Sequence, residues 1–435
     1  MNLHVLPAQS IKGEVAMPRS KTHSFRALVL AALADGTSTI RKPKISNDWN
    51  IAVGGLQQFG ATIKETEPNV FRVTGVGGNL QTPKEVIHVG NSGTMLFFLA
   101  GVAAACPGIS IITGDESIRL LRIISRNLFQ PFEELGVSIT SSKNDGMAPL
   151  IIKGNVNGGV AHMDGTGCQP VFSILIASAL SSKPVELFVT SPGETAYIDL
   201  LLFWFKKAGI ECQNVGGTHS HYVFPGNQLA KAFDETIPLE WSASAYPLLA
   251  ALILPNSKMT VKNMDFADPY GDKFVIDVLR QMGGDIRVHD GNLTAQSSRL
   301  HGIEVDMNLL PDQVPTVAVA ACFAKGATVI TNALTARWKE CDRISAICKE
   351  LKKMGADIRE KSDGLVIHGI EGKNMHGASI DGHKDHRMVL SLAVAGMQAT
   401  GETVITDAEM VEKSFETFIP DMTHAGALFA LKERT

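Results

Sequence analysis

The chain has 435 residues, of which 45% are hydrophobic and 19% charged, and its 40 Lys+Arg against 44 Asp+Glu give a formal net charge of −4. This length is enough for two or three domains, each with its own core. Because nucleic-acid surfaces need clustered cations and stacking rings, the balanced charge and the 6% aromatic content argue against a nucleic-acid partner.

Export and membrane insertion are not expected either. The longest apolar run, Met95 to Cys106, is far shorter than the roughly 18 to 20 residues that span a bilayer. The N-terminus, Met1 to Pro7, lacks the basic region and the long apolar core of a secretory signal. The six cysteines form no CxxC pair and no dense framework, which predicts reduced thiols and a cytoplasmic location.

A helix that ends in glycine and is followed by a short alternating strand is predicted six times along the chain. The glycines are spaced 71 to 76 residues apart, and 435/6 is 72.5. The six segments are LQQFGATI (Gly60), FEELGVSI (Gly136), FKKAGIEC (Gly209), LRQMGGDI (Gly283), LKKMGADI (Gly355) and the weaker MTHAGALF (Gly426). Six repeats therefore fill the chain, and an ordinary α/β protein with coincidental glycines is the alternative.

A second helix, rich in Ala, Leu and Val on all sides, alternates with the first. Such helices are buried rather than amphipathic. The segments are RALVLAALADG, MLFFLAGVAAACPG, VFSILIASALSS, AYPLLAALILPN, TVAVAACFAKG and MVLSLAVAGMQATG. Each repeat is predicted to run helix, strand, helix, strand, with the Ala-rich helix packed inside a compact domain.

Polar residues collect immediately before each buried helix. They lie at Ser20 to Arg26, Gly90 to Thr94, Asp164 to Pro170, Glu240 to Ser244, Leu310 to Pro315 and Lys384 to Arg387. Helix N-termini attract anions, and ordinary capping explains part of this pattern. Capping does not explain the cations Lys21, Arg26, His386 and Arg387, which the helix dipole repels. They indicate anionic ligands.

A further polar cluster, TARWKECDR, spans Thr335 to Arg343. Lys339 and Arg343 are four residues apart, which predicts that both lie on one helical face; a surface strip of salt bridges is the alternative. Lys413, in MVEKSFETF, would by itself be interpreted as a solvated lysine.

Together these motifs make the chain resemble the 5-enolpyruvylshikimate-3-phosphate synthase family (3-phosphoshikimate 1-carboxyvinyltransferases) over essentially its full length. The matching pieces are SKTHSFRALVLAALADGTS, GNSGT, GDES, NLLPD, KECDRISAICKELKKMGADI and KDHRM. The related UDP-N-acetylglucosamine enolpyruvyl transferases share the repeat architecture but lack the KE-x-DR and DHRM pair, and they form the alternative family.

The resemblance implies a two-domain inside-out α/β barrel, built from six repeats of about 72 residues with three per domain, whose buried parallel helices are surrounded by sheets. Residues 21–239 would form the acceptor-side domain. Residues 1–20 plus 240–435 would form the domain that clamps phosphoenolpyruvate. Helix N-termini of both would face one cleft.

The implied reaction transfers the enolpyruvyl (carboxyvinyl) group of phosphoenolpyruvate to the 5-hydroxyl of shikimate 3-phosphate, in the aromatic amino-acid and chorismate pathway. The hydroxyl adds to C2 while C3 is protonated, and the tetrahedral intermediate loses phosphate. The family implies small-molecule substrates, no metal, no organic cofactor and no membrane. A monomer is expected.

The resemblance also assigns roles to individual residues. The acid/base and reacting-centre residues would be Lys21, Asp312 and Glu340. Phosphoenolpyruvate would be held by Lys21, Gly93, Arg122, Arg343, His386, Arg387 and Lys413. The acceptor would be held by Thr22, Arg26, Asn91, Cys168, Gln169, Tyr197, Asp312, Thr335 and Lys339.

Three departures from the family pattern leave the acceptor open. Leu121 occupies the position at which the family has a phosphoenolpyruvate-binding arginine, and Arg122 would replace that arginine if the alignment shifts by one residue. Phe97 occupies a second position at which the family commonly has arginine. Cys168-Gln169-Pro170 replaces the Ser-Ser-Gln that holds the acceptor's phosphate and ring. A transferase with another hydroxylated anionic acceptor, and a non-catalytic phosphoenolpyruvate or anion-binding protein, are therefore alternatives. Retention of the three acid/base residues favours an enzyme.

Overall fold

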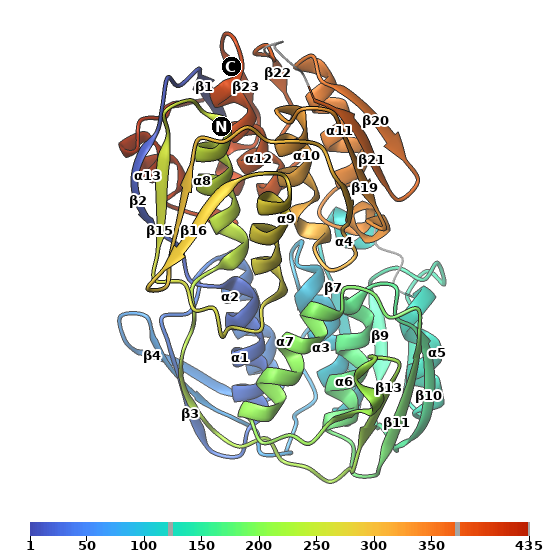
Figure 1. The fold of residues 1–435 in the computed structure, drawn as a ribbon. Helices are drawn as coiled ribbons and strands as arrows, with labels where there is room; N and C mark the ends of the chain where they lie inside the picture. Colours follow the sequence, from blue (N-terminus) through green and yellow to red (C-terminus); the bar gives the residue numbers. More distant parts are fainter. Residues whose placement is uncertain (121–124, 370–374, 434–435) are drawn as a thin grey trace. The chain divides into compact units, whose positions relative to one another are not determined.

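The computed structural model describes residues 1–120, 125–369 and 375–433, and the chain divides into two compact units (Figure 1). The N-terminal unit is Arg19–Pro238, and the C-terminal unit combines Met1–Pro18 with Leu239–Thr435. In the described parts of the chain, no helix combines the length and apolar character needed to cross a membrane.

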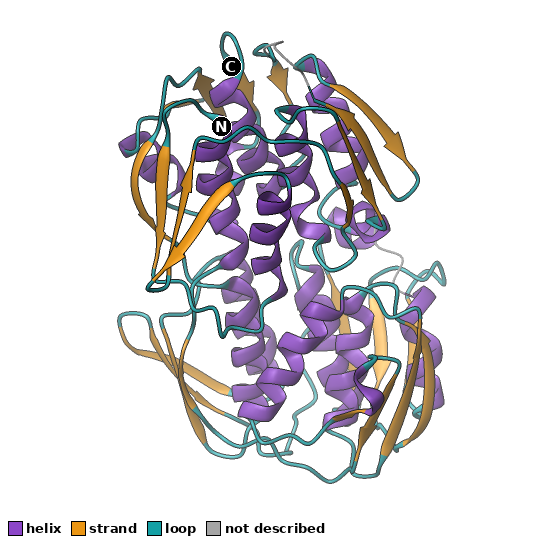
Figure 2. Cartoon of the chain, viewed as in Figure 1, coloured by secondary structure: helices purple, strands orange, loops and turns teal. Residues whose placement is uncertain are grey.

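Six Ala-rich helices form the cores of the two units, as predicted. They are α1 (Lys21–Leu33), α3 (Gly93–Ala105) and α6 (Cys168–Ala179) in the N-terminal unit, and α8 (Trp241–Ile253), α10 (Val314–Cys322) and α12 (His386–Gln398) in the C-terminal unit. Nearly every side chain in them is buried. Helix α3 packs on α6, while α8, α10 and α12 pack on one another. Figure 2 shows the strands of each unit lying outside its helices.

The second set of helices is more polar on its outer side. It comprises α2 (Asn47–Gln58), α5 (Ser125–Glu134), α7 (Thr195–Lys207), α9 (Val275–Gln281), α11 (Arg343–Lys353) and α13 (Phe418–His424), with the short α4 (Glu116–Leu120) before α5. The predicted terminating glycines follow these helices with φ between +67° and +114°. Because L side chains rarely adopt this left-handed backbone, glycine ends the helices there.

Each unit contains three four-stranded sheets within the described residues. In the N-terminal unit the sheet orders are β14 (Asp234–Thr236), β3 (Thr37–Arg41), β5 (Val70–Thr74), β4 (Thr62–Glu67); β6 (Ile87–His88), β7 (Ile109–Thr113), β9 (Leu150–Lys153), β8 (Ser138–Ser141); and β10 (Gly159–Asp164), β11 (Val185–Thr190), β13 (His221–Phe224), β12 (Gln213–Asn214). In the C-terminal unit they are β2 (Lys12–Ala16), β15 (Lys258–Lys262), β17 (Asn292–Gln296), β16 (Asp285–His289); β18 (Glu304–Asp306), β19 (Ala327–Thr331), β21 (Gly364–His368), β20 (Asp357–Lys361); and β22 (Ser379–Ile380), β23 (Thr403–Ile405), β1 (Asn2–Leu6), β24 (Leu428–Lys432).

All six sheets share one pairing pattern, with a parallel first pair followed by two antiparallel pairs. The first strands of the chain complete two sheets of the C-terminal unit: β1 pairs with β23 and β24, and β2 pairs with β15. Residues 1–18 therefore belong to that unit. The expected alternation of helix, strand, helix, strand is wrong in its strand number. Three strands rather than one follow the second helix of the first five repeats; in the sixth, among the described residues, α13 is followed by β24, while β1 and β2 come from the start of the chain.

Candidate active site

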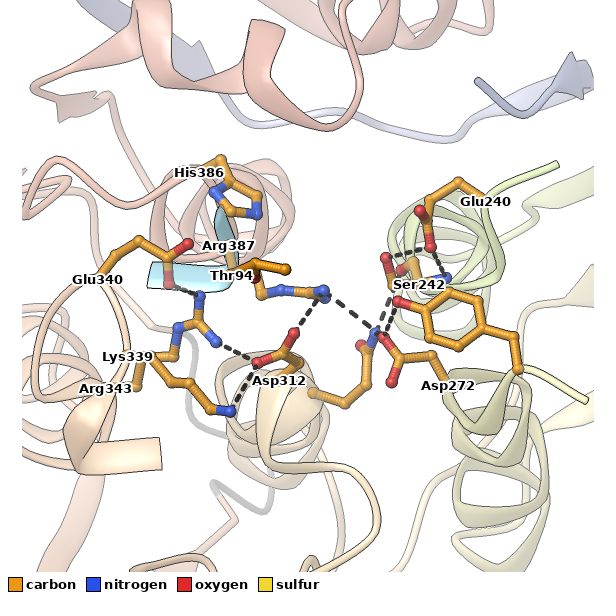
Figure 3. A network of polar contacts seen from close by, with 12 residues as sticks. Thr94, Glu240, Ser242, Asp272, Asp312, Lys339, Glu340, Arg343, His386 and Arg387 are labelled. Atoms are coloured by element: carbon orange, nitrogen blue, oxygen red, sulfur yellow. Dashed lines mark hydrogen bonds and ion pairs between the residues drawn. The ribbon is translucent and has the colours of Figure 1, made fainter. Parts of the chain in front are cut away.

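The predicted polar segments all lie at helix starts, and in the C-terminal unit they build a connected ionic cluster (Figure 3). Asp312 lies in the short 3₁₀ turn η3 (Pro311–Gln313) that leads into α10. Arg343 is the first residue of α11, and His386 and Arg387 are the first two of α12. Three separate elements thus bring their first residues to one place.

Arg343 is the centre of this cluster. Its guanidinium, only 1% exposed, lies 2.7 Å from Asp312 Oδ1 through Nη1, 2.8 Å from Glu340 Oε2 through Nη2 and 2.7 Å from Asp385 Oδ2 through Nε. Burial by itself would lower the pKa of Arg343, but the surrounding carboxylates raise it well above its usual value. The planar fork of arginine offers five N–H donors in fixed directions, which suits it to bind several carboxylates in a defined geometry.

Asp312 links Arg343 to Arg387. Its second oxygen, Oδ2, lies 2.8 Å from Arg387 Nη2, and Lys339 Nζ lies 3.9 Å from Oδ1. Burial would raise the pKa of Asp312, but the charges of Arg387, Arg343 and Lys339 outweigh burial and hold this pKa well below its usual range. At neutral pH this residue is therefore a carboxylate, which can accept a proton but has none to donate.

Arg387 retains hydrogen-bonding capacity beyond these ion pairs. Its Nη2 also lies 3.5 Å from Oδ2 of the fully buried Asp272, whose Oδ2 accepts from Tyr270 Oη at 3.2 Å. Arg387 Nε and Nη1 have no hydrogen-bond partner among the described residues. A buried donor without a partner costs about 1 to 3 kcal/mol, so two such donors favour binding of an anion.

Asp385 was not singled out from the sequence. This fully buried residue caps α12 by accepting from the Arg387 backbone N–H at 2.8 Å, and the same side chain binds Arg343. His386 Nδ1 lies 3.8 Å from Asp385 Oδ1. An aspartate before a helix is typical of a cap, and the sequence holds no signal that it also binds Arg343.

The expectation that Lys339 and Arg343 share a helical face is wrong. Lys339 lies on extended backbone directly after η4 (Leu334–Trp338), and α11 begins only at Arg343, so these cations do not share a helical face. They meet instead on Asp312. Lys413, at the end of η5 (Ala408–Lys413), is not a solvated side chain: it is 12% exposed and its Nζ lies 3.7 Å from Glu340 Oε1.

The N-terminal unit brings together three of the predicted acceptor residues. Buried Arg26 donates from Nη1 to the backbone oxygen of Thr22 at 3.1 Å and from Nη2 to that of Tyr197 at 3.0 Å. Its guanidinium carbon lies 4.7 Å from the ring centre of Phe172 and 5.6 Å from that of Phe98. These aromatic rings stabilise a buried cation in a fixed orientation.

The start of α6 carries an acidic neighbour that sequence reasoning missed. The backbone N–H of buried Cys168 donates to Glu194 Oε2 at 2.9 Å, and Glu194 is itself 1% exposed. Gln169 Nε2 donates to Thr94 Oγ1 at 3.3 Å, which ties α6 to the start of α3. A carboxylate therefore already lies at a helix N-terminus of the kind that attracts anions.

Three of the remaining predicted residues lie at helix starts of the N-terminal unit. Lys21 is the first residue of α1 and is partly exposed; Asn91 precedes α3, and Gly93 begins it. Thr335 is buried in η4, and its Oγ1 has no hydrogen-bond partner in the described part of the chain. Arg122 lies outside the described residues. That Lys21 meets the Arg343 cluster across the two units stays a prediction.

The fold and the ionic cluster define a class of protein. Its members are two-domain α/β proteins of six repeats, in which arginines and carboxylates at helix starts form a site suited to small anions. A model of the family "EPSP synthase (3-phosphoshikimate 1-carboxyvinyltransferase)" matches residues 5–422. The chain belongs to this family, and the resemblance seen in its motifs is confirmed.

Individual relatives cover nearly the whole chain. A 3-phosphoshikimate 1-carboxyvinyltransferase of Acetivibrio thermocellus is 41% identical over 417 residues, which are 95% of this chain and 96% of that protein. The protein of the same name from Methanocaldococcus jannaschii is 38% identical over 436 residues, 99% of either chain. The structure is also similar to that of an EPSP synthase from Acinetobacter baumannii, with a TM-score of 0.79 and 25% identity over 99% of this chain and all of that one.

Proposed function

We propose that the protein transfers the enolpyruvyl group of phosphoenolpyruvate to the 5-hydroxyl of shikimate 3-phosphate and releases phosphate. The observation that carries the proposal is the Arg343–Asp312–Arg387 chain of ion pairs in a member of this family that matches the family model over residues 5–422. An ionised carboxylate between two arginines supplies both a base and cationic groups for a substrate with a carboxylate and a phosphate.

In the proposed mechanism, the acceptor hydroxyl attacks C2 of phosphoenolpyruvate while a proton is added to C3. Asp312, a carboxylate at neutral pH, would accept the hydroxyl proton as the C2–O bond forms. Glu340 contacts both Arg343 and Lys413 and would exchange the proton at C3, with Lys21 as the cation of the reacting centre. The tetrahedral adduct would then lose phosphate as Glu340 takes a proton back from the C3 methyl group, so that the C2=C3 double bond is restored and the C2–O bond to the acceptor remains.

The binding roles follow the same division of residues. Arg343, His386, Arg387 and Lys413, with Gly93, would hold phosphoenolpyruvate. The acceptor would be held by Arg26, Thr22 and Tyr197, which the structure brings together, and by the other predicted acceptor residues Asn91, Cys168, Gln169, Thr335 and Lys339. We also propose that the enzyme is a cytoplasmic monomer without a nucleic-acid partner; all six cysteines are free, as is typical of a reducing compartment.

Phosphate release tests the proposal. Purified protein mixed with phosphoenolpyruvate and shikimate 3-phosphate is expected to release inorganic phosphate in proportion to enzyme. A flat trace at high enzyme concentration would reject shikimate 3-phosphate as the acceptor. Binding of phosphoenolpyruvate by calorimetry would then favour a transferase for another hydroxylated anion, because Cys168 and Glu194 alter the expected acceptor subsite. Loss of both signals would leave only an anion-binding protein.

A further inference from the structure

Glu350 is a fully buried carboxylate in the second half of α11, away from the ion pairs already described. Its Oε1 lies 3.0 Å from Nε2 of His383, and its Oε2 accepts from the Asp381 backbone N–H at 3.0 Å and lies 2.6 Å from Lys353 Nζ. Burial would raise the pKa of Glu350, but Lys353, the Asp381 amide and His383 lower it. The group is therefore a carboxylate, and both of its oxygens are used.

Two partners of Glu350, Asp381 and His383, belong to the turn between β22 and α12, residues 381–385, whereas Lys353 lies on α11 itself. Within this turn His383 and Lys384 have φ of +53° and +51°, two successive non-glycine residues in the left-handed region. L side chains rarely adopt this backbone, and it persists only where the surroundings impose it. The Lys384 N–H donates to Asp407 Oδ2 at 2.9 Å, so the turn is held from two sides.

The turn ends at Asp385, the residue that caps α12 and binds Arg343. Arg343 and Glu350 are seven residues apart on α11, which places them on the same face about two turns, or ~10.5 Å, from each other. Helix α11 thus contacts the 381–385 turn at both ends: Arg343 binds Asp385, and Glu350 binds Asp381 and His383.

We infer that Glu350 is a positioning residue. It holds the 381–385 turn in place, so that Asp385 can bind Arg343 and cap the start of α12 at the same time. Among the residues that the structure describes, Glu350 contacts none that is assigned to a substrate, so its effect on the site would pass through the turn. The inference rests on the proposed function, in which these arginines bind phosphoenolpyruvate. It predicts that loss of the Glu350 charge weakens phosphoenolpyruvate binding without a matching loss of global stability.

The test uses the whole chain with Glu350→Gln, and the same chain with Glu402→Gln as the matched control. Glu402 also pairs with a histidine, His4 Nδ1 at 2.8 Å, but is 46% exposed and lies on the β1 and β23 side of the same unit. For Glu350→Gln we expect faster amide hydrogen exchange in residues 381–387 and a KM for phosphoenolpyruvate raised about tenfold or more. The KM for shikimate 3-phosphate and the urea midpoint should change little, and the control should match the wild type.

Unchanged exchange in the turn, or an unchanged KM for phosphoenolpyruvate, would overturn the inference. A lowered urea midpoint with wild-type KM and kcat per folded molecule would also overturn it, because Glu350 would then be merely structural. If Glu350→Gln does not fold, His383→Ala replaces it, because this change removes one contact of the same carboxylate. His383→Ala should then raise the KM for phosphoenolpyruvate to a smaller extent, and an unchanged KM would reject the positioning role of Glu350. A wild type that releases no phosphate would refute the proposed function, and exchange in the turn would still decide whether Glu350 holds it.

Discussion

Asp312 Oδ1 lies 2.7 Å from Nη1 of Arg343, whose side chain is 1% exposed. The carboxylate is therefore ionised for a physical reason: proton uptake would remove its attraction to the guanidinium groups of Arg343 and Arg387. The ion pair between Asp312 and Arg343 therefore bears on the stability of the fold at low pH and on the protonation state of a proposed catalytic residue.

Acid should weaken the fold through Asp312. Its pKa is lower in the folded than in the unfolded state, so its stabilising contribution is complete above the unfolded value of about 3.9 and is lost as the pH falls below it toward the folded value. Urea unfolding at a series of pH values should show a smaller loss of free energy below about pH 4 for Asp312→Asn than for the wild type. Asp277→Asn, at an exposed ion pair with Arg280, should keep the wild-type slope. Parallel slopes for the wild type and Asp312→Asn would contradict this explanation.

Glu340→Gln should separate chemistry from binding. The amide can still accept from Arg343 Nη2, and Arg343 keeps Asp312 and Asp385, so the Kd for phosphoenolpyruvate should change only a few-fold. Turnover should fall by about 10² to 10⁴, the usual contribution of general acid–base catalysis. Calorimetry and phosphate-release rates measure the two quantities. Small and equal effects on both would remove Glu340 from the catalytic residues.

Arg387→Lys should weaken phosphoenolpyruvate binding although it keeps the charge. Lysine lacks the two donors, Nε and Nη1, that have no partner in the described residues. Two charge-assisted hydrogen bonds at about 1.5 to 3 kcal/mol each correspond to roughly a hundredfold or more in Kd. Arg287→Lys, at a side chain that is 72% exposed, is the control for the substitution itself. An unchanged Kd would show that Arg387 pairs with Asp312 but does not bind phosphoenolpyruvate through Nε and Nη1.

Glu194→Gln should improve binding of a phosphorylated acceptor. The Gln carbonyl can still accept from the Cys168 N–H, while the negative charge at the start of α6 is removed. We expect the KM for shikimate 3-phosphate to fall several-fold at an unchanged KM for phosphoenolpyruvate, by an electrostatic effect of about 0.3 to 1 kcal/mol or somewhat more. Glu186→Gln, an exposed carboxylate paired with His221, should have no effect. A higher KM for shikimate 3-phosphate would mean that Glu194 supports the acceptor site.

The sequence by itself determined the repeated architecture of this protein. Helix-ending glycines such as Gly355 and the apolar composition of the buried helices are local properties, since they depend on backbone conformation and on hydrophobicity within one segment. The positions of the cationic helix starts, Arg387 among them, are local for the same reason. The family followed from these short motifs.

Only the tertiary structure decided which partners these residues have. From the sequence alone, Asp385 is interpreted as a helix cap and Glu350 as an ordinary helix residue. Their contacts join positions 42 and 31 residues apart in the chain, which no local pattern indicates. The contact of Lys413 with Glu340 likewise joins segments that are remote in the chain. Ion pairing depends on distance and burial in three dimensions, and a linear pattern contains neither.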